Sequence, residues 1–91
     1  MSEGKKLKTF FLTKNARQDL EYWRVHQPKK LIKIAQLIES AMADPESGIG
    51  KPERLKYQDE ITYSRRIDLQ NRMVYTISNQ CLNIIQLRQH Y

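Results

Sequence analysis

The 91-residue chain has very few of the residues and segments that mark secreted and membrane proteins. Its one cysteine, Cys81, cannot form an internal disulfide, which agrees with a reducing compartment. No apolar run approaches the roughly 20 residues of a membrane span. The charged N-terminus is not followed by an apolar segment of signal-peptide length. We therefore expect a cytoplasmic protein that makes no contact with a membrane.

Residues for metal and cofactor sites are equally scarce. Two histidines and one cysteine, far apart in the sequence, do not form a zinc pattern. Residues 48–51 faintly resemble a phosphate-binding loop, but the glycine spacing is wrong and Pro52 stands where serine or threonine is needed. The sequence has neither a nucleophile elbow nor a dinucleotide fingerprint. We expect no cofactor and no metal.

Acidic side chains are missing from the C-terminal part of the chain. After Asp68 there is no side-chain carboxylate, only Arg72 and Arg88. The whole chain has a formal charge of +6 and a pI of about 9.6. A basic balance favours nucleic acid, an anionic surface or an acidic protein as the partner, and charge alone does not choose among them.

The order of apolar and turn residues predicts one α+β domain with elements in the order β-α-α-β-β-β. The length leaves no room for a second core. Residues 8–12 favour a strand, and Thr13 suits the cap of a helix that ends near His26. Pro28 suits the first turn of a second helix, which apolar residues at helical spacing extend to Met42.

The second half of the sequence predicts three strands. A loop rich in proline and glycine, residues 44–52, separates them from the helices. Residues 61–68, 72–78 and 81–89 have the composition of strands joined by tight connections. The economical packing places the two N-terminal helices on one face of an antiparallel sheet. We expect residues 1–7 to be a mobile extension.

The side chains that could carry chemistry gather in this second half. Cleaving RNA without a metal needs a base for the 2′-hydroxyl, a cation for the charge that grows on the phosphate, and an acid for the leaving 5′ oxygen. Glu53 lies among lysines and arginines that favour its ionised form, as a base requires. Arginine pairs two phosphate oxygens and stays charged. His90 suits the acid, because histidine titrates near neutral pH.

The arginines around the last hairpins allow two arrangements. A three-residue loop, residues 68–70, places Arg66 opposite Arg72, whereas a two-residue loop places Arg65 there instead. No glycine fixes this turn. Taken singly, Glu53, the arginines and His90 are more often solvated surface groups than catalytic ones. From composition alone, a non-catalytic basic module that binds RNA or an acidic partner is the simpler interpretation.

Five short motifs, in this order, resemble the YoeB/Txe toxins, which belong to the RelE-like toxins of bacterial type II toxin–antitoxin systems. The motifs are Glu21-Tyr22-Trp23, Gly50-Lys51-Pro52-Glu53 with Leu55-Lys56, Ser64-Arg65-Arg66-Ile67, Arg72-Met73-Val74-Tyr75 and His90-Tyr91. The resemblance implies a microbial RNase-like fold and a metal-independent, ribosome-dependent endoribonuclease that cuts mRNA in the decoding site of the 70S ribosome. It also implies a YefM-type antitoxin, operator DNA bound only through the antitoxin complex, and a toxin homodimer.

The same resemblance assigns roles to residues of this chain. Glu53 resembles the general base and His90 the general acid, Arg66 and Arg72 the phosphate-stabilising cations, and Tyr91 a residue that shapes the site. It favours the three-residue loop. Candidates for substrate binding are Lys51, Arg54, Lys56, Tyr57 and Arg65. Arg54 and Tyr57 depart from the family pattern, where proline and histidine are common, so base and codon preference stay open.

Overall fold

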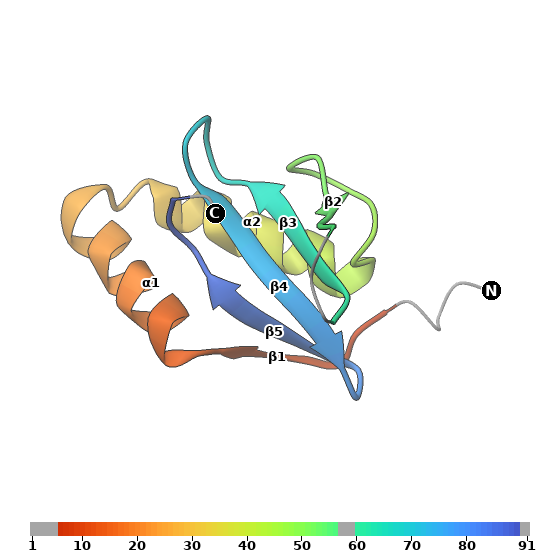
Figure 1. The fold of residues 1–91 in the computed structure, drawn as a ribbon. Helices are drawn as coiled ribbons and strands as arrows, with labels where there is room; N and C mark the ends of the chain where they lie inside the picture. Colours follow the sequence, from red (N-terminus) through yellow and green to blue (C-terminus); the bar gives the residue numbers. More distant parts are fainter. Residues whose placement is uncertain (1–5, 57–59, 90–91) are drawn as a thin grey trace.

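The computed structural model describes residues 6–56 and 60–89, which form two helices and one five-stranded sheet (Figure 1). The elements are β1 (Thr9–Leu12), α1 (Lys14–His26), α2 (Lys30–Ala43), β2 (Glu53–Arg54), β3 (Thr62–Arg66), β4 (Arg72–Ser78) and β5 (Cys81–Gln86). The predicted α+β fold is confirmed, with both helices packed on the sheet. The sequence did not predict the two-residue strand β2.

The strand order in the sheet is β1-β5-β4-β3-β2. The pairs β2–β3, β3–β4 and β4–β5 are antiparallel, whereas β1 runs parallel to β5, with Phe10 opposite Leu82. The sheet is therefore mixed, and the prediction of a wholly antiparallel sheet was wrong at this edge. A parallel pair needs a long crossover connection, and the two helices are part of the chain that makes it.

Thr13 joins α1 to the sheet. Its hydroxyl oxygen accepts a hydrogen bond from the N–H of Ala16 at 3.2 Å, as a helix cap does, and donates to the carbonyl of Ile85 at 3.0 Å. α1 ends at His26, as predicted, and α2 begins at Lys30 in the turn that follows Pro28. In Figure 1, α2 lies behind the sheet, so one face of the sheet packs on the helix and the other faces the viewer.

The core lies between the helices and the sheet and extends to the N-terminal end of the described chain. Trp23 and Leu37 of the helices and Tyr75 and Leu82 of the sheet are almost fully buried within it. Leu7 is buried in the same core, and its N–H donates to the carbonyl of Met42 at 2.8 Å. We expected residues 1–7 to be a mobile extension, and this expectation was wrong for Leu7. Residues 1–5 lie outside the described residues.

Arg65 is the one fully buried arginine in the described part of the chain, and it holds the loop after α2 against the sheet. Its guanidinium donates to the carbonyls of Asp44 (2.7 Å), Ser47 (2.8 Å) and Ile49 (3.0 Å), all in or next to that loop. It also donates to the hydroxyl of Tyr75 at 2.9 Å. The carbonyl of Asp44 is at the end of α2, where helix carbonyls carry partial negative charge and are suitable partners for a buried cation.

Replacing Arg65 should therefore be costly. We expect Arg65→Ala to lower the free energy of unfolding by about 3 kcal/mol or more, because several buried carbonyls lose their donor at once. The matched control is Arg66→Ala, since Arg66 is the next residue on the same strand and is exposed. It should stay within about 0.5 kcal/mol of the unchanged protein. Urea denaturation measures both, and equal values for the two variants would contradict a structural role for Arg65.

Candidate active site

The candidate site begins with a carboxylate and a guanidinium from different strands. β2 pairs with β3 so that Glu53 lies opposite Ser64 on one face of the sheet. Arg72, the first residue of β4, donates from Nη2 to Oε1 of Glu53 at 3.1 Å and from Nε to Oγ of Ser64 at 2.9 Å. The Arg72 side chain is 17% exposed and that of Glu53 is 66% exposed, so the pair opens to solvent on the carboxylate side.

Arg66 lies directly opposite Arg72 in the β3–β4 pair, which confirms the three-residue loop register. Side chains of opposite residues leave a sheet on the same face, with Cβ atoms about 5 Å apart. Arg66 is exposed. The site therefore begins with two arginines and one glutamate on adjacent strands, an arrangement that suits an anionic ligand.

The turn between β3 and β4 is stabilised by Asp68, although it has no glycine. One Asp68 oxygen, Oδ1, accepts from the N–H groups of Gln70 at 2.9 Å and Asn71 at 2.7 Å. The Asn71 side-chain amide also donates to Oδ1 of Asp68 at 3.0 Å. Lys30 of α2 forms an ion pair with Oδ2 of Asp68, also at 3.0 Å. Burial raises the pKa of Asp68, but the hydrogen bonds from Gln70, Lys30 and Asn71 outweigh it and hold the pKa below the usual 3.8.

The C-terminal segment returns to the start of β4. The N–H of Gln89 donates to Oδ1 of Asn71 at 2.5 Å, and the N–H of Arg72 donates to the carbonyl of Gln89 at 3.1 Å. The last described residue therefore lies beside Arg72. The predicted acid His90 and the predicted site residue Tyr91 lie outside the described residues.

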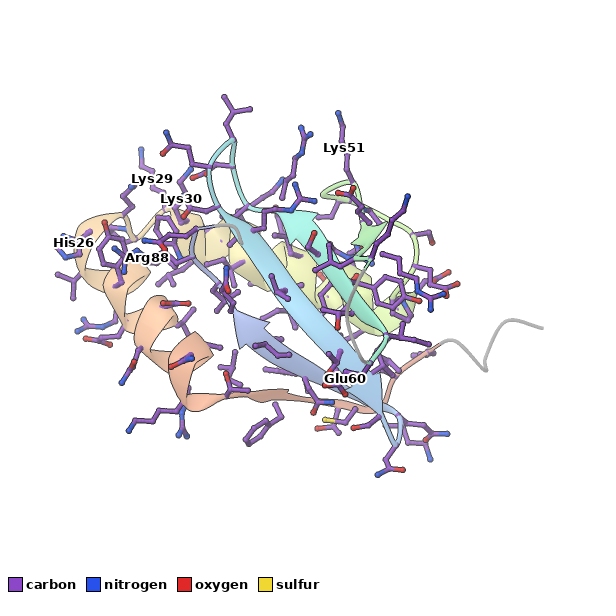
Figure 2. All side chains as sticks on the ribbon, viewed as in Figure 1. His26, Lys29, Lys30, Lys51, Glu60 and Arg88 are labelled. Atoms are coloured by element: carbon purple, nitrogen blue, oxygen red, sulfur yellow. The ribbon has the colours of Figure 1, made fainter. Side chains whose placement is uncertain are left out.

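The remaining candidates do not all join this group. Lys51 and Lys56 are exposed on either side of β2, and Figure 2 shows Lys51 pointing away from the sheet. Arg54 lies opposite Tyr63 and so belongs to the other face of the sheet from Glu53. The prediction of Arg65 as a substrate-binding residue was wrong. Its guanidinium is buried and donates to acceptors inside the protein, so it does not reach the site. Tyr57 lies outside the described residues.

Sequence reasoning missed two residues that fix the geometry. Ser64 holds the Arg72 side chain, and Asn71 holds Gln89. The signal for Ser64 was present, because it stands two positions before Arg66 in a predicted strand and therefore on the same face. Asn71 stands between two predicted strands, where asparagine is typical of a turn and does not indicate a contact with the C-terminal segment. In residues 6–56 and 60–89 no three side chains of the metal-binding kinds come together.

Known proteins share this arrangement of strands and helices. The family described as "YoeB-like toxin of bacterial type II toxin-antitoxin system" matches residues 12–91. The chain belongs to this family. A curated relative, Toxin YoeB of Synechocystis sp., is 47% identical to this YoeB-like toxin over 70 residues, 76% of this chain and 81% of the relative.

Two solved structures from Staphylococcus aureus have the same fold as this YoeB-like toxin. The YoeB dimer has a TM-score of 0.82 at 33% identity, covering 91% of this chain and 97% of that one. The heterotetrameric YoeB–YefM toxin–antitoxin complex also has a TM-score of 0.82 at 33% identity, covering 94% and 99%. In the described part of this chain, neither helix has the length and apolar composition needed to cross a bilayer.

The Asp68 turn makes a pH-dependent contribution to the stability of the YoeB-like toxin. Because the pKa of Asp68 is lowered in the folded state, its contribution is present above the unfolded pKa and is lost as pH falls through the folded pKa. We expect Asp68→Asn to lower the free energy of unfolding by about 1–2 kcal/mol at neutral pH. Below about pH 4 the free energy of unfolding should fall less steeply with pH in this variant than in the unchanged protein. Urea denaturation at a series of pH values tests this, and parallel curves for the two proteins would contradict it.

Proposed function

We propose that this YoeB-like toxin is a ribosome-dependent endoribonuclease that cuts mRNA in the decoding site without a metal. The observation that supports it best is the contact of Arg72 with Glu53, beside the anchored Gln89 that precedes His90 in the sequence. A base, a fixed cation and an acid are the groups that cleavage through the RNA 2′-hydroxyl needs.

In the proposed reaction each group has one task. The carboxylate of Glu53 takes the proton of the 2′-hydroxyl. The 2′ oxygen then bonds to phosphorus while the bond from phosphorus to the 5′ oxygen breaks. Arg66 and Arg72 hold the phosphate oxygens as negative charge grows on them, and His90 gives a proton to the leaving 5′ oxygen. The products are a 2′,3′-cyclic phosphate and a 5′-hydroxyl.

Three further candidates surround this group in the proposal. Lys51 and Lys56 contact neighbouring phosphates, which their exposure allows. Tyr91 shapes the site, and Tyr57 stacks on a base, as aromatic residues do on single-stranded RNA. The departures at Arg54 and Tyr57 affect substrate preference and leave the reacting groups in place.

The proposed docking surface on ribosomal RNA is the basic side of the helices. Its members are Lys14, Arg17, Arg24, Lys29, Lys30 and Lys33. Most are exposed, and Figure 2 shows Lys29 and Lys30 together at the turn between the helices. Cations of this kind bind RNA phosphates through screened electrostatics, so binding should weaken as salt rises.

The proposed protein partner is an antitoxin of the YefM type, as in the S. aureus complex. A charge of +6 suits an acidic partner that folds on contact. Operator DNA is then bound only through the toxin–antitoxin complex. A homodimer, as in the S. aureus YoeB structure, and a cytoplasmic location complete the proposal.

Cleavage of a short mRNA on translating ribosomes tests the assignment. We expect Glu53→Ala and His90→Ala each to slow cleavage by about 10²-fold or more, because each removes a proton-transfer group. Glu60→Ala is the matched control. It also removes an exposed carboxylate in the basic protein, but Glu60 lies at the far end of the sheet from Lys51 (Figure 2).

The control should cleave at the rate of the unchanged protein. Equal cleavage by all four proteins would show that the roles are wrong. Deleting His90 and Tyr91 then separates an enzyme from a binding module, since a binding module keeps its affinity for ribosomes and yields no cut product before or after the deletion.

A further inference from the structure

Residues 87–89, the segment that follows β5, are held by side chains of α1 that the proposed chemistry does not use. The N–H of Leu87 donates to Oδ2 of Asp19 at 3.0 Å, and its carbonyl accepts from Nε1 of Trp23 at 2.7 Å. Asp19 and Trp23 are four positions apart and therefore lie on one face of the helix. Both polar groups of the Leu87 backbone are thus bonded to side chains from the other end of the sequence.

The next residue is held by an aromatic ring of the same helix. The guanidinium carbon of Arg88 lies 3.6 Å from the centre of the Tyr22 ring, well inside the range of a cation–π contact. The Tyr22 ring packs edge-on against Trp23, with 5.4 Å between ring centres, and its plane is tilted by 37° against the ring of His26, with 4.4 Å between centres. Figure 2 shows Arg88 and His26 at the same end of the molecule, beside the turn between the helices.

Gln86 closes the turn that carries the chain to the site. Its side-chain amide donates to the carbonyls of Arg88 at 2.9 Å and Gln89 at 3.2 Å. Gln89 has a φ of 65°, a left-handed conformation that residues other than glycine seldom adopt. Its N–H and carbonyl are bonded to Asn71 and Arg72. The segment is therefore fixed on one side by α1 and on the other by the start of β4.

We propose that Asp19, Tyr22 and Trp23, here called the C-terminal clamp, are positioning residues that hold residues 87–89, the chain leading to the proposed acid, beside Arg72. The inference rests on the proposed function. It also gives the Tyr22-Trp23 motif a task, since the proposed catalytic steps do not use either ring. Displacing a catalytic group by about 1 Å is enough to cost 10²-fold in rate. None of the three clamp residues is among the groups assigned to the proposed reaction.

Tyr22 is the clamp residue best suited to a test. Trp23 is 1% exposed, so its removal would disturb the core, whereas Tyr22 is only partly buried. Tyr22→Phe keeps the ring over Arg88, and Tyr22→Leu removes it. Arg88→Leu breaks the same contact without altering α1. Val25→Ala, at an exposed position of the same helix, is the control.

Single-turnover cleavage on ribosomes should fall tenfold or more in Tyr22→Leu and in Arg88→Leu, because the clamp acts on the chemical step. It should stay within twofold in Tyr22→Phe and Val25→Ala. The affinity of Tyr22→Leu for ribosomes should stay within twofold of the unchanged protein. Rates that do not differ between Tyr22→Leu and Tyr22→Phe would overturn the inference.

Hydrogen exchange of the Gln89 amide in the isolated protein tests the clamp without using activity. Exchange should be faster by tenfold or more in Tyr22→Leu and unchanged in Tyr22→Phe, because only the first frees the segment. If the unchanged protein does not cleave RNA, the proposed function fails. The exchange rate of the Gln89 amide still tests whether the clamp holds residues 87–89. Equal exchange in all variants would overturn it.

Discussion

The register of β3 against β4 is the constraint on which the rest of this structure depends. With Arg66 opposite Arg72, strand alternation sends Arg65 into the interior and Arg66 to the open face. A slip by one residue would exchange them. Arg65 would then lie on the surface, and the loop after α2 would lose the guanidinium that donates to its carbonyls. The Asp68 turn stabilises this register, and because the turn is bonded to Lys30, the register is tied to α2.

From this register the candidate site follows as a series of contacts between distant segments. Arg72 begins β4 and binds Glu53 through its side chain and Gln89 through its backbone. Residues 87–89 reach that point because α1 holds them from the other side. The strands position Glu53, Arg66 and Arg72, whereas α1, which contains none of the proposed reacting groups, holds the chain that leads to the proposed acid.

Local signals in the sequence were enough for most of the fold. The Thr13 cap, the helical spacing up to Met42 and the β-forming residues of β4 each act within a few positions, so their elements were predicted nearly to the residue. The pairing of strands that are distant in the sequence was harder to predict. β2 is two residues long, directly follows the loop rich in proline and glycine, and exists only through its pairing with β3. The parallel β1–β5 contact likewise depends on tertiary packing, which periodicity does not report.

For the candidate site, residue types indicated which side chains carry chemistry, but two neighbouring arginines of one strand could not be told apart until the register was known. In the proposed reaction, cleavage uses the hydroxyl of the RNA itself, with no metal. The most direct measurement is cleavage on ribosomes of an mRNA that carries a single 2′-deoxy nucleotide at the cut position. We expect no cut at the 2′-deoxy position, and a 2′,3′-cyclic phosphate on the product from the unmodified message. A cut of equal rate at the 2′-deoxy position would contradict it.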